Sequence, residues 1–147
     1  MYTPAEKEIL QAAEEIVTRY AVGRTFEGAK DTQEVFTHRL AGKEREVFEV
    51  AFLDTKHRLL KIDRMFLGTI DRGSVHPREV VKAALEYNAA AAILAHNHPS
   101  GESTPSTADK RLTERLVEAL SIVDVRTLDH IVVGKGECTS FAESGLL

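Results

Sequence analysis

The sequence predicts a mixed α/β fold in which a β-sheet is flanked by helices. Helical and strand patterns follow one another in the order helix, helix, strand, strand, helix, strand, helix, strand, strand, and no internal repeat interrupts them. The composition, 43% apolar and 29% charged, is typical of a soluble globular protein. A chain of 147 residues suits one domain that buries roughly two thirds of its unfolded surface in one core.

A long helix is expected at the N-terminus. Thr3 and Glu6 form a capping-box pattern, Pro4 takes the first helical position, and Gly23 supplies a C-terminal stop. Because the helix carries an apolar stripe, we expect it to pack on the rest of the domain or on a second copy of the chain, which would make a homo-oligomer. The apolar residues at helical spacing are Ile9, Leu10, Ala13, Ile16, Val17 and Tyr20.

A second, shorter helix should precede the sheet. Asp31 and Glu34 repeat the capping pattern, and the helix is expected to run to about Leu40 with its apolar residues facing inward. We therefore divide the chain into an N-terminal helix and linker, residues 1–30, and one globular domain, residues 31–147.

The remaining elements are predicted from apolar periodicity and from turn residues. The run at 46–53, the polar turn at 54–57 and a second run over about 59–67 predict an antiparallel hairpin. The later elements expected are a loop over 71–73, a helix over about 77–88, a strand over 89–95, a helix over 107–120, a strand over 125–133, a turn over 134–136 and a short strand over 139–141. The residues expected to be buried on the two later helices are Val80, Val81, Ala84, Leu85, Leu112, Leu116, Val117 and Leu120.

The stretch 95–109, A-H-N-H-P-S-G-E-S-T-P-S-T-A-D, gathers side chains that bind metals. His96 and His98 leave the end of a buried strand two residues apart, and alternate residues of an extended chain point to the same side. Proline and glycine then form a loop into the next helix, whose first turn carries Asp109. Two neutral imidazoles, one carboxylate and a fourth position for water make a hydrolytic site, with Zn²⁺ as the expected cofactor.

Each part of this pattern also has a simpler interpretation. An isolated H-x-H is more often incidental than a ligand pair. Ser106 and Asp109 also form a capping box, in which Asp109 would bond the Ser106 amide and touch no metal. The complete spacing, which is H-x-H, seven residues, S, two residues, D, is more specific than its parts. It resembles the JAMM motif of the MPN (JAB-type) metalloproteases.

Further motifs narrow this resemblance: HNHPSG followed by PS-x-x-D, with HPRE upstream and LDHIVVG downstream. Together they resemble the RadC family, a bacterial branch of the JAMM proteins, over about residues 31–147. The resemblance implies an MPN fold of cytidine-deaminase-like architecture, with His96, His98 and Asp109 as zinc ligands. It also implies that Ser106 polarises the substrate carbonyl or its oxyanion, and that an upstream glutamate is the general acid and base.

Three glutamates near the first strand are candidates for this base: Glu44, Glu46 and Glu49. Periodicity alone does not choose among them. The resemblance to RadC proteins favours Glu46, two residues before the strand residue Phe48, and a regular strand turns Glu49 to the opposite face. The implied activity is hydrolysis of a peptide or isopeptide bond in a peptide or protein substrate, with Glu46 as proton acceptor and Ser106 as oxyanion donor.

A function of a different class is an alternative. The RadC family carries a DNA-repair label, so the chain is alternatively a DNA-repair or recombination accessory protein without hydrolytic activity. The formal net charge of −4 argues against a broad phosphate-binding face, and we expect no strong direct binding of nucleic acid. A third interpretation is a scaffold like the metal-free MPN proteins, but those lose ligand residues that this chain keeps.

Other conspicuous residues are expected to be structural. His76 of the HPRE motif and the pair Asp129 and His130 match the family pattern, but their spacing predicts no ligand geometry. Cys138 is the single cysteine, which excludes an internal disulfide, a cysteine-rich zinc site and the P-C-x-x-C pattern of the zinc deaminases.

The expected location of the protein is the cytoplasm. No apolar run approaches the ~18 residues needed to span a membrane. The N-terminal residues, M-Y-T-P-A-E-K-E, lack the basic and hydrophobic regions of a signal peptide. We therefore expect no membrane association.

Overall fold

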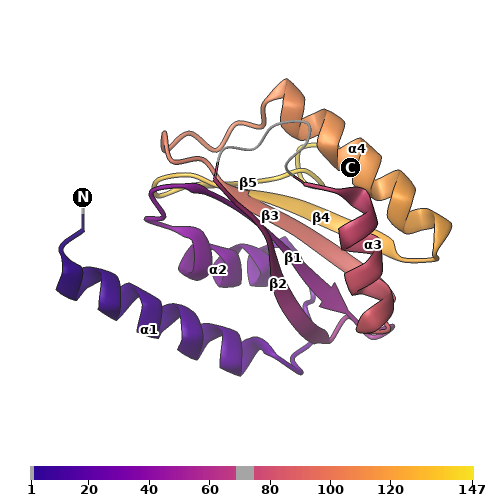
Figure 1. Cartoon of the computed structure of the whole chain (residues 1–147), viewed down its shortest axis with the longest axis horizontal. Helices are drawn as coiled ribbons and strands as arrows, with labels where there is room; N and C mark the ends of the chain where they lie inside the picture. The colour runs from indigo at the N-terminus through magenta and orange to yellow at the C-terminus, as the bar shows by residue number, and fades with distance from the viewer. Residues whose placement is uncertain (1, 69–74) are drawn as a thin grey trace.

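In a computed structural model of the chain, one mixed β-sheet carries helices on both of its faces (Figure 1). The structure describes residues 2–68 and 75–147. The elements are α1 (Pro4–Ala21), α2 (Ala29–Leu40), β1 (Glu46–Leu53), β2 (Leu59–Gly68), α3 (Pro77–Glu86), β3 (Ala91–Asn97), α4 (Thr107–Ile122), β4 (Arg126–Val133) and β5 (Cys138–Ser140). Their order confirms the predicted fold class and the predicted succession of helices and strands.

The strands lie in the spatial order β2-β1-β3-β4-β5. β3 and β4 are parallel, whereas the other neighbouring strands are antiparallel. The parallel pair requires a crossover, which α4 supplies on one face of the sheet. The loop over residues 98–106 joins the end of β3 to the start of α4.

Side-chain alternation along the strands divides the interior into two cores. On β1, Val47 and Ala51 pack with the residues of α1 and α2, whereas Phe48, Val50 and Phe52 pack with those of α3 and α4. Nearly every β1 residue is therefore buried, and strict apolar and polar alternation is absent from its sequence.

The predicted start of α2 is wrong. The helix begins at Ala29 after Gly28, which as N-cap has no side-chain hydrogen bond, so Asp31 is not the cap. Asp31 instead lies in the first helical turn, where its carboxylate accepts the Glu27 N–H over 3.0 Å. A carboxylate in the first turn is stabilised by the helix dipole, which explains the acidic pattern without a capping box.

The predicted strand at 89–95 lies two residues further along the chain. His96 and Asn97 belong to β3, because His96 pairs with Phe48 of β1 and Asn97 pairs with Val133 of β4. Pairing on both sides extends a strand beyond the point where its apolar run ends. The first histidine of the motif is therefore part of the sheet.

Smaller differences concern the later elements. Leu85, expected to be buried, is 59% exposed, because Val80, Ala83 and Ala84 are the residues that α3 turns toward the sheet. β5 begins at Cys138, one residue earlier than predicted. On α4, Leu116 and Leu120 are fully buried as expected, whereas Leu112 and Val117 are half-buried. The loop predicted at 71–73 lies outside the described residues.

The long N-terminal helix α1 packs on the domain only in part. Ala21 at its end is buried, and its N-terminus has the predicted capping box between Thr3 and Glu6. Ile9 and Tyr20 are 67% and 68% exposed, so much of the predicted apolar stripe faces outward. Packing on a second copy remains an expectation. None of the described helices combines the length and the apolar character needed to cross a bilayer.

A buried ion-pair network fastens α1, α2 and β2 to β1. Glu49 is fully buried, and its two carboxylate oxygens accept from Arg39 over 2.8 and 2.6 Å. Arg64 lies 3.2 Å from Glu49 and 3.1 Å from Glu14, and Lys43 donates to Glu14 over 2.7 Å. The Glu49 side chain therefore points to the face of the sheet that carries α1 and α2.

We predict that Glu49→Gln lowers the free energy of unfolding by about 3 kcal/mol, because it leaves the Arg39 guanidinium buried beside a neutral amide. Urea denaturation of the purified variant measures this change. Glu44→Gln is the matched control, since Glu44 forms an exposed ion pair with Lys7, and it should change stability by less than about 1 kcal/mol. Equal midpoints for the two variants would contradict the prediction.

Candidate metal centre

The sheet places both histidines of the motif on one side of β3. Leu94 and His96 alternate with Ala95, and Leu94 belongs to the core beneath α3 and α4. His98 follows two residues after His96, and its backbone N–H donates to the Val133 carbonyl over 2.9 Å. The imidazoles of His96 and His98 therefore both face the start of α4.

Asp109 completes the group from the first turn of α4. Its Oδ2 lies 3.0 Å from His98 Nε2 and its Oδ1 lies 3.2 Å from His96 Nε2, while the two Nε2 atoms are 3.0 Å apart. Zinc bonds of about 2.0–2.2 Å in a tetrahedral site separate two ligand atoms by roughly 3.3 Å. His96 and Asp109 are buried and His98 is half-buried. These three residues can therefore hold a metal ion.

Ser106 and Asp109 form a capping box at the start of α4, and Asp109 is a candidate metal ligand as well. The Ser106 hydroxyl accepts the Asp109 N–H over 3.0 Å, and Asp109 Oδ2 accepts the Ser106 N–H over 2.8 Å. The two interpretations of this pair, which compete in the sequence, thus coexist in the structure. Because the Ser106 oxygen accepts, its own proton is still available for donation, and the side chain is exposed beside the group.

The ionisation of Asp109 and His98 is shaped by their contact. Burial opposes the charge of Asp109, but its contacts with the imidazoles of His96 and His98 outweigh burial and hold the pKa of this carboxyl well below its usual range. The hydrogen bond with Asp109 raises the pKa of His98, against the effect of burial. The carboxylate is therefore charged at neutral pH, as a metal ligand must be.

The orientation of His98 is set by the loop that follows it. Its Nδ1 lies 2.8 Å from the carbonyl oxygen of Glu102. A carbonyl only accepts, so Nδ1 carries a proton and donates. Nε2 is the atom that faces His96 and Asp109: it donates to the Asp109 carboxylate when it carries a proton, and in the neutral ring it would offer its lone pair to a metal ion.

Two residues behind His96 were not identified as site residues from the sequence. His130 Nε2 lies 2.7 Å from His96 Nδ1, and His130 Nδ1 lies 2.6 Å from the hydroxyl of Thr113. Complete burial lowers the pKa of His130 well below its usual value, so its ring is neutral. The spacing of Asp109 and Thr113, four residues apart on one helix, was a signal that both face the same way.

Glu46 lies at the start of β1, on the same face as the two histidines. Phe48 pairs with His96 and stacks on its ring, and Glu46 is two residues further along the strand on that side. The negative charge of Glu46 contributes to the raised pKa of His98. Glu49 faces the opposite side, as the strand alternation predicts.

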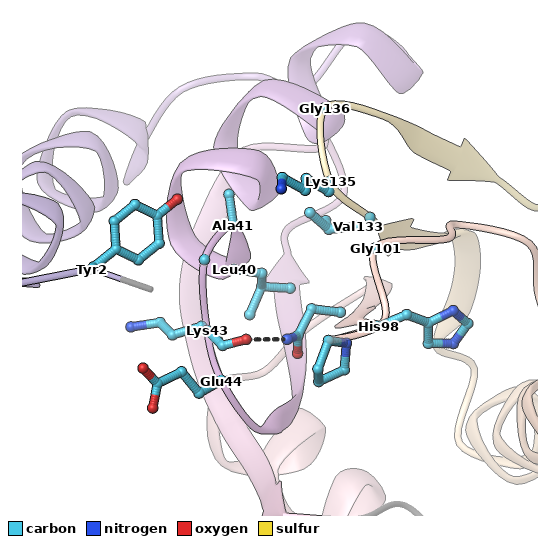
Figure 2. A pocket seen from close by; sticks show the side chains of 14 residues that line it. Tyr2, Leu40, Ala41, Lys43, Glu44, His98, Gly101, Val133, Lys135 and Gly136 are labelled. Atoms are coloured by element: carbon cyan, nitrogen blue, oxygen red, sulfur yellow. Dashed lines mark hydrogen bonds between the residues drawn. The ribbon is translucent and has the colours of Figure 1, made fainter.

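Asn97 holds the segment that leads into β1. Its side chain points away from the histidines, its Oδ1 accepts the Val47 N–H over 2.7 Å, and its Nδ2 donates to the Arg45 carbonyl over 2.9 Å. A weaker bond to the Lys43 carbonyl is drawn in Figure 2. The residue between the two candidate ligand histidines therefore fixes the backbone on both sides of Glu46.

The other motif residues have structural surroundings. Asp129 is buried, and it accepts from the Ser140 hydroxyl and from the N–H groups of His130 and Ala142, which ties β4 to the turn after β5. His76 is exposed at the start of α3. Neither is part of the His–His–Asp group.

A cavity of about 640 Å³ lies behind the ligand loop rather than over the metal centre. Figure 2 shows that it is bordered by Tyr2, Lys43 and Lys135, and that the His98 imidazole is directed away from it. Of the three candidate ligands, only His98 touches this cavity. The cavity is therefore separate from the side of the histidines that faces Asp109.

The ligand loop rests on the turn between β4 and β5. The Lys135 N–H donates to the Gly101 carbonyl over 2.8 Å, and Glu137 Oε1 accepts the Ser103 N–H over 3.0 Å. A Cβ atom at Gly134 would collide with the Gly101 carbonyl oxygen and lie 3.0 Å from the Ser103 nitrogen. The close approach of these two backbones therefore requires glycine at 134.

These features define a class of protein: a JAB/MPN-like domain with a His–His–Asp group that can bind a metal ion. A family model described as "RadC-like JAB domain" matches residues 26–146. The chain therefore belongs to the RadC-like JAB domain family, as the sequence motifs predicted.

Three relatives that resemble most of this chain are named as UPF0758 proteins. A UPF0758 protein of Vibrio cholerae is 54% identical over 97% of this chain and 90% of its own length. The UPF0758 protein YeeS of Escherichia coli K12 is 48% identical over 99% of each chain. A UPF0758 protein of Methylibium petroleiphilum is 52% identical over 98% of this chain, which spans 67% of that longer protein. These names state no activity.

We predict that the native protein binds close to one metal ion per chain, and that His96→Ala, His98→Ala and Asp109→Ala each lose most of it. Each substitution removes one of three ligands and leaves too few to hold the ion. Elemental analysis of the purified proteins measures the metal content. His38→Ala, an exposed histidine on α2, is the control. Full occupancy in Asp109→Ala would limit that residue to its capping role.

A second prediction concerns the support beneath the loop. Gly134→Ala should force the ligand loop away from the β4–β5 turn, destabilise the fold by about 1–3 kcal/mol and weaken metal binding. Chelator competition and thermal unfolding measure the two effects. Gly28→Ala is the matched control, because a Cβ atom there meets nothing within 4 Å. Unchanged metal affinity in Gly134→Ala would show that the loop does not depend on this contact.

Proposed function

We propose that the protein is a zinc-dependent hydrolase of the JAMM type that cleaves a peptide or isopeptide bond. The observation that supports this most directly is the convergence of His96, His98 and Asp109, with Glu46 on the same face of the sheet. Membership of the RadC-like JAB family agrees with it.

The donor set favours zinc over other common ions. Two imidazole nitrogens and one carboxylate oxygen suit Zn²⁺, whereas Mg²⁺ and Ca²⁺ prefer oxygen ligands alone. Three protein ligands leave one tetrahedral position open, which distinguishes a catalytic zinc site from a structural one. Bound zinc would supply Lewis acidity, which lowers the pKa of water toward about 7 and polarises a carbonyl.

The remaining roles belong to side chains of this chain. The Glu46 carboxylate accepts the proton of the attacking water and returns it to the leaving nitrogen, as a general base and then a general acid. The Ser106 hydroxyl donates its proton in a hydrogen bond to the carbonyl oxygen of the substrate as negative charge develops there. Asp109 keeps that hydroxyl in place through the capping box.

No observation favours the alternative of a DNA-repair accessory protein without hydrolytic activity. The complete ligand group supports an enzyme, and the net charge of −4 does not support a phosphate-binding face. Three expectations remain predictions: weak binding of nucleic acid, a peptide or protein substrate, and a cytoplasmic location.

We predict that Glu46→Gln folds normally and keeps its zinc, but hydrolyses its substrate about 10²–10⁴ times more slowly, because an amide does not accept the proton of the attacking water. A peptide and isopeptide library incubated with the zinc-loaded protein supplies the substrate for this measurement.

The control for this variant is Glu44→Gln, and not Glu49→Gln. Glu44 is exposed and ion-paired with Lys7, whereas removing the charge of the buried Glu49 disturbs the fold. Undiminished hydrolysis by Glu46→Gln would refute its assignment as the base. Loss of zinc from Glu46→Gln would make this residue a ligand instead.

A further inference from the structure

We propose that His130 and Thr113 are positioning residues that fix the tautomer of His96, so that its Nε2 lone pair faces the metal. This inference rests on the proposed metal site and adds to it two residues that touch neither the ion nor the substrate. It assigns a function to the histidine of the LDHIVVG motif, which the ligand group leaves unexplained.

The contacts form a continuous chain from one ligand to the other. His96 Nδ1 lies 2.7 Å from His130 Nε2, and His130 Nδ1 lies 2.6 Å from Thr113 Oγ1. The Thr113 hydroxyl lies 2.7 Å from the backbone carbonyl oxygen of Asp109. This row of hydrogen bonds therefore begins on β3, passes through His130 of β4 and ends at Asp109 of α4, which would supply the carboxylate ligand.

The last contact determines the direction of every proton in this chain. A carbonyl oxygen only accepts, so the Thr113 hydroxyl donates its single proton to the backbone carbonyl oxygen of Asp109. Its oxygen must then accept, which requires a proton on His130 Nδ1. In the neutral ring His130 Nε2 accepts, so His96 Nδ1 must carry a proton and donate it. His96 Nε2 is left with its lone pair, and it is this atom that lies beside Asp109.

The reverse direction would leave His96 without a lone pair for the ion. If the Thr113 hydroxyl donated to His130, the contact with the Asp109 carbonyl would carry no proton, and His96 Nε2–H would donate to Asp109 Oδ1, 3.2 Å away, in place of binding the metal. The forward direction is the one in which all three short contacts are hydrogen bonds. In this direction Nε2 is the metal-facing atom of His96. The same atom faces the metal position in His98, because the Nδ1 of His98 donates to the Glu102 carbonyl.

Burial of His130 and Thr113 makes any other arrangement of these protons costly. His130 is fully buried and Thr113 is 3% exposed, so water does not replace a missing partner at low cost. The His130 ring stacks on Phe141 with centroids 4.6 Å apart, and Phe48 meets it edge-on at 5.6 Å. The two aromatic rings hold the imidazole in the plane that reaches both His96 and Thr113.

The experiment compares two substitutions at Thr113. Thr113→Val keeps the shape of the side chain but removes the acceptor of the His130 Nδ1 proton, whereas Thr113→Ser keeps the hydroxyl. Imidazole nitrogen NMR shifts of the chelator-treated protein report the tautomers of His96 and His130. Chelator competition measures zinc affinity, and thermal unfolding verifies that each variant is folded.

We expect the wild-type protein and Thr113→Ser to carry the protons of His96 and His130 on Nδ1. In Thr113→Val the Nε2–H form of one or both rings should appear, and zinc affinity should fall roughly 10–100-fold, as for other partners of metal-bound histidines. Unchanged tautomers and affinity in Thr113→Val would overturn the inference. So would an Nε2–H form of His96 in the wild-type protein, or an equal loss of affinity in Thr113→Ser.

The two proposals fail in different ways. A wild-type protein that does not bind zinc would refute the proposed hydrolase, while the NMR shifts would still decide whether His130 and Thr113 set the tautomer of His96. A protein that binds zinc and hydrolyses its substrate, but has the reverse proton order, would refute only this inference.

Discussion

The centre depends on the pairing of the last residues of β3 on both sides. β1 pairs with His96 and β4 pairs with Asn97, so neither residue turns without breaking the hydrogen bonds of the sheet. The backbone N–H of His98, just after the end of β3, donates to the Val133 carbonyl of β4. The backbone thus places two candidate ligands before any ion binds, and only Asp109 must be brought by α4. A site that is preorganised in this way loses less conformational entropy when the metal binds.

The two faces of β1 have different roles, one structural and one directed toward the candidate metal centre. Glu49 is buried among Arg39 and Arg64 and fastens the N-terminal helices to the sheet, while Glu46 lies toward the histidines. The side chain of Asn97 connects the strand to the ligand loop by bonding the backbone on either side of Glu46. Substitutions at neighbouring glutamates of one strand should therefore affect stability in one case and chemistry in the other.

Several residues of the centre have a structural and a chemical role together. Ser106 caps α4 and is the proposed oxyanion donor, and Asp109 completes the capping box while it faces both histidines. Thr113 binds the Asp109 carbonyl and orders the protons behind His96. The start of α4 and the candidate metal centre are thereby linked through shared hydrogen bonds, so a shift of the helix would displace Asp109 and disturb the contacts of His96 together.

The sequence by itself determined the fold class, the order of the elements and the three candidate ligands. These depend on local signals: capping boxes, apolar periodicity, and a spacing that puts His96 and His98 on one side of a strand. Only the tertiary structure decided that Glu49 joins an ion-pair network and that His130 and Thr113 lie behind His96. Those contacts join residues distant in the chain, and they follow from which strands become neighbours and which helix covers each face. Periodicity identifies the face of a strand or helix, but it does not identify the partner that this face meets.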